Sequence, residues 1–136
     1  MNNWLLPALI ALVIYGFWGF FPKLATQYIS PRSAIIYQII GSIAVALWAL
    51  NSLNFQLETH PKGILYAVLT GMAGFGGTLF FYMAVQKGNV SSVVTLTAMY
   101  PVITIMLAYF FLHEPITIKQ FIGFGFAGLA IYLMST

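Results

Sequence analysis

Five apolar runs, each close to twenty residues long, limit what this chain can fold into. Every acidic, basic and histidine side chain lies between these runs or near their ends. A helix of about 20 apolar residues crosses the ~30 Å hydrocarbon core of a bilayer. The predicted spans cover residues 4–22, 34–53, 63–86, 91–112 and 117–134. We therefore predict an all-α integral membrane protein whose 136 residues form one domain of five transmembrane helices.

The composition excludes a water-soluble globule. The sequence is 61% hydrophobic and only 5% charged, with a mean hydropathy of +0.94, whereas soluble domains carry about 25% charged residues. The net charge is +3, and the charged residues are scattered singly without a basic cluster, so we expect no nucleic-acid partner. The partner we expect from the apolar composition is the lipid bilayer. Cysteine is absent, which excludes disulfides and thiol chemistry.

The loop charges leave the orientation open. With five spans the termini lie on opposite sides, and the N-terminal side holds Lys62 and Lys119 against Lys23, Arg32 and Lys87 on the other side. The positive-inside rule favours a cytoplasmic C-terminus only slightly at this ratio. One alternative is a weakly marked single topology, and the other is dual topology, with copies inserted both ways. The N-terminus lacks the basic region and cleavage site of a signal peptide, so we expect the first span to be retained.

Each of the first four spans carries a thin stripe of polar and aromatic side chains. In the third and fourth spans the members recur three or four residues apart, which places them on one helix face. The candidate lining residues are Tyr15, Trp18 and Gly19 in the first span, Gln38 and Ser42 in the second, Thr78, Tyr82 and Gln86 in the third, and Thr97, Tyr100 and Thr104 in the fourth. Such stripes suit neutral, zwitterionic or amphipathic small organic solutes, with cation–π contact available to a cation. The alternative for the aromatic residues is helix packing or a place at the membrane interface.

Pro101 lies within the stripe of the fourth span. Because proline has no N–H, it cannot donate to the carbonyl of Thr97, and its ring favours a kink. A freed carbonyl inside a bilayer is tolerated only against protein or a wet cavity. We therefore predict a helix kink at Pro101, facing a polar pathway.

The sequence holds no metal-ligand cluster, nucleophile–base pair or phosphate loop, so we expect no enzyme, cofactor or metal site. No charged residue lies in the middle of a span, which argues against an intramembrane proton relay. Glu114 closes the fourth span, where it pairs with Lys119 or caps the next helix. Lys23 closes the first span, where it reaches the headgroups or attracts an anionic group at a cavity mouth.

Small residues mark the last span. Gly123 and Ala127 follow a small-xxx-small spacing that lets helix backbones approach closely, and Gly128 lies next to them. Packing within the chain is one use of this surface. Because the span has few polar side chains, contact with another protomer is the use we favour.

The second half of the sequence, from LFFYMAVQKGNVSS to GFAGLAIYL, strongly resembles the EamA repeat of the drug/metabolite transporter superfamily. The family pattern has an FFYxAL-like end to the third helix and a short turn. A helix with a central proline and an LxE ending follows, and then a Gly-rich last helix of the type QxxGxxLIxxG. The matching residues are Tyr82, Ala84, Pro101, Leu112, Glu114, Gln120, Gly123 and Gly128, with Trp18, Gly19 and Lys23 fitting the WG…K of the first helix. The resemblance covers nearly the whole chain.

This resemblance implies a half-size protein. The typical family member fuses two such repeats with inverted topology into ten spans and holds solute between them. A single repeat therefore implies a partner, either a second copy in an antiparallel homodimer or another half-size membrane protein. The resemblance assigns solute contacts to Trp18, Tyr82 and Tyr100. The arginine common in the family's second helix is replaced near Tyr37–Gln38, and the first-helix glutamate of small multidrug transporters is missing.

The function we predict is transport of small organic solutes by alternating access, in the inner (cell) membrane of a bacterium or an archaeon. Two alternatives stay open. One is a non-transporting partner subunit of a hetero-oligomeric transporter, and the other is a component of a lipid flippase.

Overall fold

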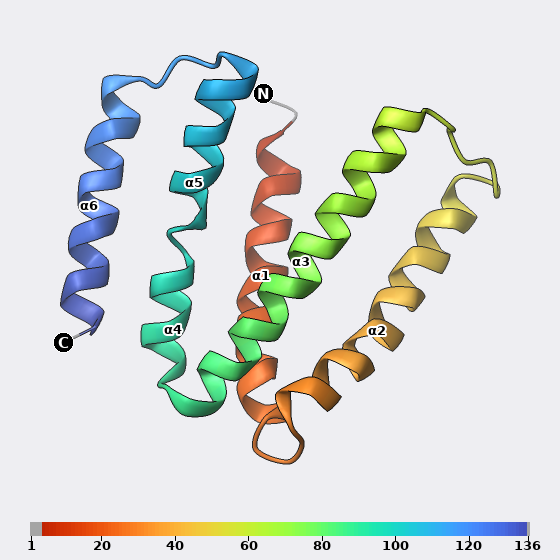
Figure 1. The fold of residues 1–136 in the computed structure, drawn as a ribbon, viewed down its shortest axis with the longest axis horizontal. Helices are drawn as coiled ribbons and strands as arrows, with labels where there is room; N and C mark the ends of the chain where they lie inside the picture. The colour runs from red at the N-terminus through yellow and green to blue at the C-terminus, as the bar shows by residue number, and fades with distance from the viewer. Residues whose placement is uncertain (1–3, 136) are drawn as a thin grey trace. The chain divides into compact units, whose positions relative to one another are not determined.

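The computed structural model describes residues 4–135, and these are helical with short connections (Figure 1). The elements in chain order are α1 (Leu5–Ala25), α2 (Pro31–Ser52), α3 (Pro61–Lys87), α4 (Val90–Thr97), α5 (Tyr100–Leu107), the π-helical turn η1 (Ala108–Leu112) and α6 (Ile118–Ser135). The described residues contain no strand. The predicted all-α class is confirmed.

Four stretches in the described part of the chain have the length and apolar composition to cross a membrane. They are α1, α2, α3 and the continuous stretch Val90–Leu112, which comprises α4, α5 and η1. The fifth, Ile118–Met134 in α6, is apolar but shorter. The chain divides into two compact units, Met1–Lys87 and Gly88–Thr136, here called unit 1 and unit 2 and each described by itself.

In unit 1, α3 packs against both α1 and α2. Figure 1 shows the C-terminal ends of α1 and α3 at the same end of this unit as the N-terminal end of α2. The buried side chains of the unit gather there. We call this group the packed end, and its members are Gly19, Pro22, Thr26, Pro31, Ala34, Thr78, Phe81, Tyr82 and Val85.

Local sequence explains why α2 begins where it does. The Ser30 hydroxyl accepts a hydrogen bond from the Ser33 amide at 3.2 Å, and Pro31 occupies the first turn. Proline is favoured there because the first-turn N–H has no partner within the helix. The helix therefore starts at Pro31, three residues before the predicted start at residue 34.

In unit 2, the predicted fourth span is divided into two short helices. α4 ends at Thr97, two residues form a turn, and α5 begins at Tyr100 with Pro101 in its first turn. Two helix segments therefore stand where the sequence predicts one kinked helix, with the interruption just before Pro101. Proline is favoured at this position, because an N–H group in the first turn of a helix has no acceptor within that helix.

The end of this span is also irregular. η1 closes with the Glu114 amide donating to the Ala108 carbonyl at 3.4 Å, and His113 adopts the left-handed conformation with φ 56°. Side chains at the start of α6 then form a reciprocal cap, since Gln120 Oε1 accepts from the Thr117 amide at 2.8 Å and Thr117 Oγ1 accepts from the Gln120 amide at 3.3 Å. This capping box satisfies two amides at the start of α6.

Candidate functional site

An aromatic contact joins α1 to α3 in unit 1. The rings of Trp18 and Phe81 stack with centroids 5.1 Å apart and an interplanar angle of 25°. Phe81 is 6% exposed, whereas Trp18 keeps 38% of its surface accessible. Trp18 therefore combines a fixed ring orientation with an accessible face, which is what contact with an apolar or cationic solute requires.

Tyr82 and Thr78, two of the three stripe residues predicted on α3, lie in the packed end. Tyr82 is 6% exposed and Thr78 is 7% exposed. The Thr78 hydroxyl donates to the Gly74 carbonyl at 2.7 Å, so its proton is already used within the helix. Gln86, the third member, is exposed.

Lys23 connects the ends of α1 and α3. Its Nζ donates to the Val85 carbonyl at 2.7 Å, close to the C-terminal end of α3 at Lys87. The last carbonyls of a helix have no partners within the helix and form the negative end of its dipole, so an ammonium group stabilises them. The sequence suggested headgroups or an anionic group for Lys23, and this carbonyl adds a partner inside the protein.

The side chain of Gln38 on α2 is half-buried, and its Oε1 atom is buried without a hydrogen-bond partner among the described residues. Ser42 lies one turn further on, and its hydroxyl donates to the backbone carbonyl of Gln38 at 3.1 Å. The two predicted lining residues of the second span are therefore adjacent on one face of α2. Of the two, Gln38 has the buried side-chain oxygen that accepts no hydrogen bond from a described residue.

The remaining predicted residues of α1 lie in different surroundings. Gly19 is buried in the packed end. Tyr15, one turn nearer the N-terminus, is 62% exposed. The structure therefore brings together Trp18, Gly19, Lys23, Thr78 and Tyr82 at one end of unit 1 and leaves Tyr15 on its surface.

In unit 2, the three predicted stripe residues are exposed, with Tyr100 at 63%. The Thr97 hydroxyl donates to the Val93 carbonyl at 2.9 Å, and the Thr104 hydroxyl donates to the Tyr100 carbonyl at 3.3 Å. Both threonines use their protons on their own helix. Pro101 is exposed beside them.

Glu114 forms no salt bridge within the described residues 4–135, and the side-chain cap of α6 comes from Thr117 and Gln120 instead. The small residues Gly123 and Gly128 are exposed, and a Cβ added to either would meet no atom within 4 Å. Ala127 is half-buried. Packing among the described residues therefore does not require glycine at positions 123 and 128.

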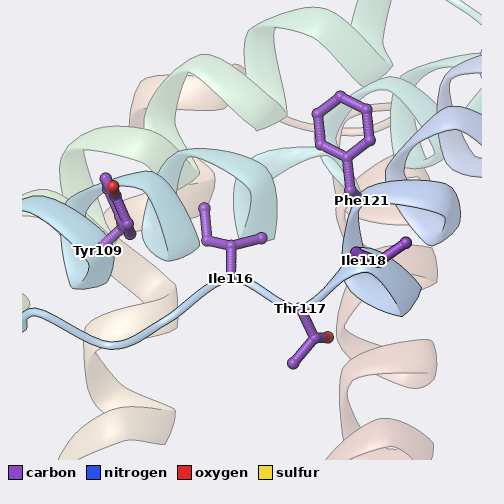
Figure 2. Close-up of a pocket in the computed structure, with 5 residues that line it drawn as sticks. All are labelled: Tyr109, Ile116, Thr117, Ile118 and Phe121. Atoms are coloured by element: carbon purple, nitrogen blue, oxygen red, sulfur yellow. The ribbon is translucent and has the colours of Figure 1, made fainter.

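Unit 2 also has an open hollow of about 400 Å³ at the junction of η1 with α6 (Figure 2). Tyr109, Ile116, Thr117, Ile118 and Phe121 line it. Figure 2 shows Ile116 and Phe121 pointing to one side of the connecting segment and Thr117 to the other. The hollow is mainly apolar, and no sequence pattern predicted it. Among the described residues, no group of three or more histidine, cysteine, aspartate or glutamate side chains is placed to hold a metal ion.

The residues missed by sequence reasoning are Phe81 and Val85. Both are apolar members of an apolar helix, so composition does not distinguish them from lipid-facing neighbours. The signal that could have found them is spacing, because Phe81 follows Thr78 by three residues and Val85 follows Tyr82 by three, which makes them neighbours on the helix surface.

The apolar helices and the scarcity of charge define an integral, multi-pass membrane protein. The EamA-like transporter family matches residues 2–136, and the chain belongs to this family. A protein of Methanocaldococcus jannaschii, named "Uncharacterized protein MJ1333.1", is 31% identical over 135 residues, which are 99% of this chain and 98% of that protein. No solved structure matches the chain significantly. The predicted resemblance to an EamA repeat is confirmed, and the family is one of transporters.

Proposed function

We propose that this chain is one half of a transporter for small organic solutes. The observation that carries the proposal is the extent of the family match, because the family covers residues 2–136 and this length suits one repeat of five spans. We propose that a second, oppositely inserted copy completes the transporter in the cell membrane. Alternating access then follows from exchange of conformation between the two inverted repeats.

Trp18 and Tyr82 are proposed to contact solute from unit 1. The partly accessible face of Trp18 supports this role, because a ring held by stacking loses little freedom when solute binds. Tyr100 is proposed to contact solute beside the interruption of the fourth span. Gly123, Ala127 and Gly128 are proposed to contact the second protomer, since no described side chain fills the space above the two glycines.

Tyr100→Ala tests this function. Tyr100 is 63% exposed, so its removal leaves no buried cavity and the protein should stay folded. We expect solute flux to fall about 2- to 10-fold, the effect of losing one aromatic contact. The measurement is flux of labelled amino acids, amines and nucleosides into proteoliposomes that contain the purified protein.

Tyr66→Ala is the matched control, because Tyr66 is 65% exposed on α3 and lies outside the proposed lining. Equal flux for Tyr100→Ala and the unmodified protein would contradict the proposed contact. Flux that appears only with a second, copurified protein would favour a hetero-oligomer. Movement of labelled lipid instead of solute would favour a flippase component.

A further inference from the structure

A buried amide oxygen without a donor is the feature of unit 1 that its own packing does not explain. Gln38 Oε1 has almost no accessible surface, and no described residue donates to it. Inside a bilayer, water does not supply the missing hydrogen bond, so such a group costs free energy until it finds a partner. The site therefore favours any molecule that brings a donor to this oxygen.

The neighbouring hydroxyls do not serve this oxygen. Ser42, the next polar residue on the same face of α2, gives its proton to the Gln38 backbone carbonyl. Thr78, the buried hydroxyl on the facing helix α3, gives its proton to the Gly74 carbonyl. A hydroxyl has one proton to donate. Both protons are thus used, and Oε1 is left as an acceptor.

Gln38 lies where the buried stripe of α2 ends. Pro31 and Ala34 are buried on α2, and Gln38 continues their stripe at half-burial. Beyond Gln38 and Ser42, nearly all of α2 is exposed. Gln38 therefore lies at the margin of the packed end, where α2 stops burying side chains against α3.

We propose that Gln38 is a specificity-determining residue that binds the N–H donor of a primary or secondary ammonium solute. This inference rests on the proposed transport function and names the substrate class. The acceptor is a neutral carbonyl, and no carboxylate lies in the middle of any span, so recognition depends on hydrogen bonding rather than on an ion pair. A charged N–H donor suits this acceptor, because hydrogen bonds that involve an ionised partner are the stronger ones.

Two probes of equal charge separate hydrogen bonding from charge attraction. Phenethylammonium carries three N–H donors, whereas phenethyltrimethylammonium carries none and keeps the same ring. Calorimetric titration of the purified protein in lipid nanodiscs measures both affinities. We expect the unmodified protein to bind phenethylammonium about tenfold or more tightly than the quaternary probe, the range for a hydrogen bond to a charged group.

The variants assign this preference to Gln38. In Gln38→Leu, the affinity for phenethylammonium should fall about tenfold or more while that for the quaternary probe stays unchanged. Gln38→Glu keeps an acceptor at the same place and should retain the preference. Gln56→Leu, the same change in the exposed connection between α2 and α3, should alter neither affinity.

Three results would overturn the inference. The first is equal affinity of the unmodified protein for the two probes. This test does not depend on whether any variant folds. The second is an equal loss of both affinities in Gln38→Leu, which would make Gln38 a packing residue. The third is a dimer of the unmodified protein in size-exclusion chromatography that Gln38→Leu fails to form, which would place the missing donor on a second copy. Continued flux of other solutes in the proteoliposome assay would leave the transport proposal standing when this inference fails.

Discussion

In unit 1, α3 buries Phe81 and Val85 against its neighbours, whereas in unit 2 none of the described side chains from 88 to 134 is buried. The helices of unit 2 are joined instead by polar contacts near their ends, such as the Ser92 hydroxyl donating to the Met134 carbonyl at 3.2 Å. Unit 1 therefore has an internal core of its own. The apolar surface of unit 2 needs lipid or another protein surface to cover it.

This difference has a physical basis in the bilayer. Lipid tails are as apolar as leucine, so helices there associate through close packing and hydrogen bonds rather than through removal of apolar surface from water. The packed end of unit 1 supplies both, through the Trp18–Phe81 stack and the bond from Lys23 to Val85. We therefore expect loss of these contacts to lower the free energy of unfolding more than loss of the contacts in unit 2.

The largest effect should come from Phe81→Ala. Removing a 6% exposed ring leaves a cavity and ends the stack with Trp18. We expect a loss of about 2–3 kcal/mol in the free energy of unfolding, below the roughly 3–5 kcal/mol of soluble cores because the transfer from water is missing. The measurement is loss of helicity as SDS replaces a mild detergent.

Phe111→Ala is the matched control in unit 2, because Phe111 is 78% exposed. We expect a change below about 0.5 kcal/mol. A cost as large as that of Phe81→Ala would contradict the difference between the two units, since it would mean that a protein surface covers Phe111.

Lys23→Met should rank second. This change removes the donor to the Val85 carbonyl near the C-terminal end of α3. A hydrogen bond that involves a charged group contributes about 1.5–3 kcal/mol, and the partial exposure of Lys23 places the loss at the lower end. The same SDS titration measures it. Lys23→Arg keeps a charged donor and should restore most of the stability, whereas an equal loss in both variants would argue against the bond.

Gln120→Ala should rank third, in unit 2. Its side chain caps the start of α6 by accepting from the Thr117 amide at 2.8 Å. Loss of a helix cap costs about 1 kcal/mol. Gln120→Glu preserves the capping box and serves as the control. Thermal unfolding followed by circular dichroism should give Gln120→Ala a lower midpoint temperature than the unmodified protein and Gln120→Glu. Identical midpoints for all three proteins would contradict the cap.

Ser92→Ala should have the smallest effect. Its bond to the Met134 carbonyl is 3.2 Å long and exposed, so we expect a change of about 0.5 kcal/mol or less. Chemical denaturation in mixed micelles measures this change. A larger loss of stability than in Lys23→Met would contradict this ranking. It would show that contacts between α4 and α6 stabilise unit 2 more than the bond from Lys23 stabilises unit 1.

The sequence predicted the helical class and the membrane location because span length and charge scarcity are sufficient for both. It also predicted that Thr78 and Tyr82 share one face, since a period near 3.6 fixes neighbours along a helix. The family resemblance followed from the order of short motifs around Pro101 and Glu114, and the family match confirms it.

The contacts between helices could not be predicted in the same way. The stack of Trp18 on Phe81 and the bond from Lys23 to Val85 join residues about 60 positions apart. In an apolar helix, buried and lipid-facing positions have the same composition, so no periodicity indicates which face packs. The turn before Pro101 is a similar case, because a proline in a span permits either a kinked helix or two helices.

The measurement that most directly tests pairing of opposite copies is topology. The chain has no native cysteine, so Gln27→Cys and Gln56→Cys place single labels in the connections on either side of α2. An impermeant maleimide is applied to sealed cells before and after lysis. We predict that about half of each variant is labelled from outside, as two orientations require. Full labelling of one variant and none of the other would mean a single orientation and would contradict an antiparallel homodimer.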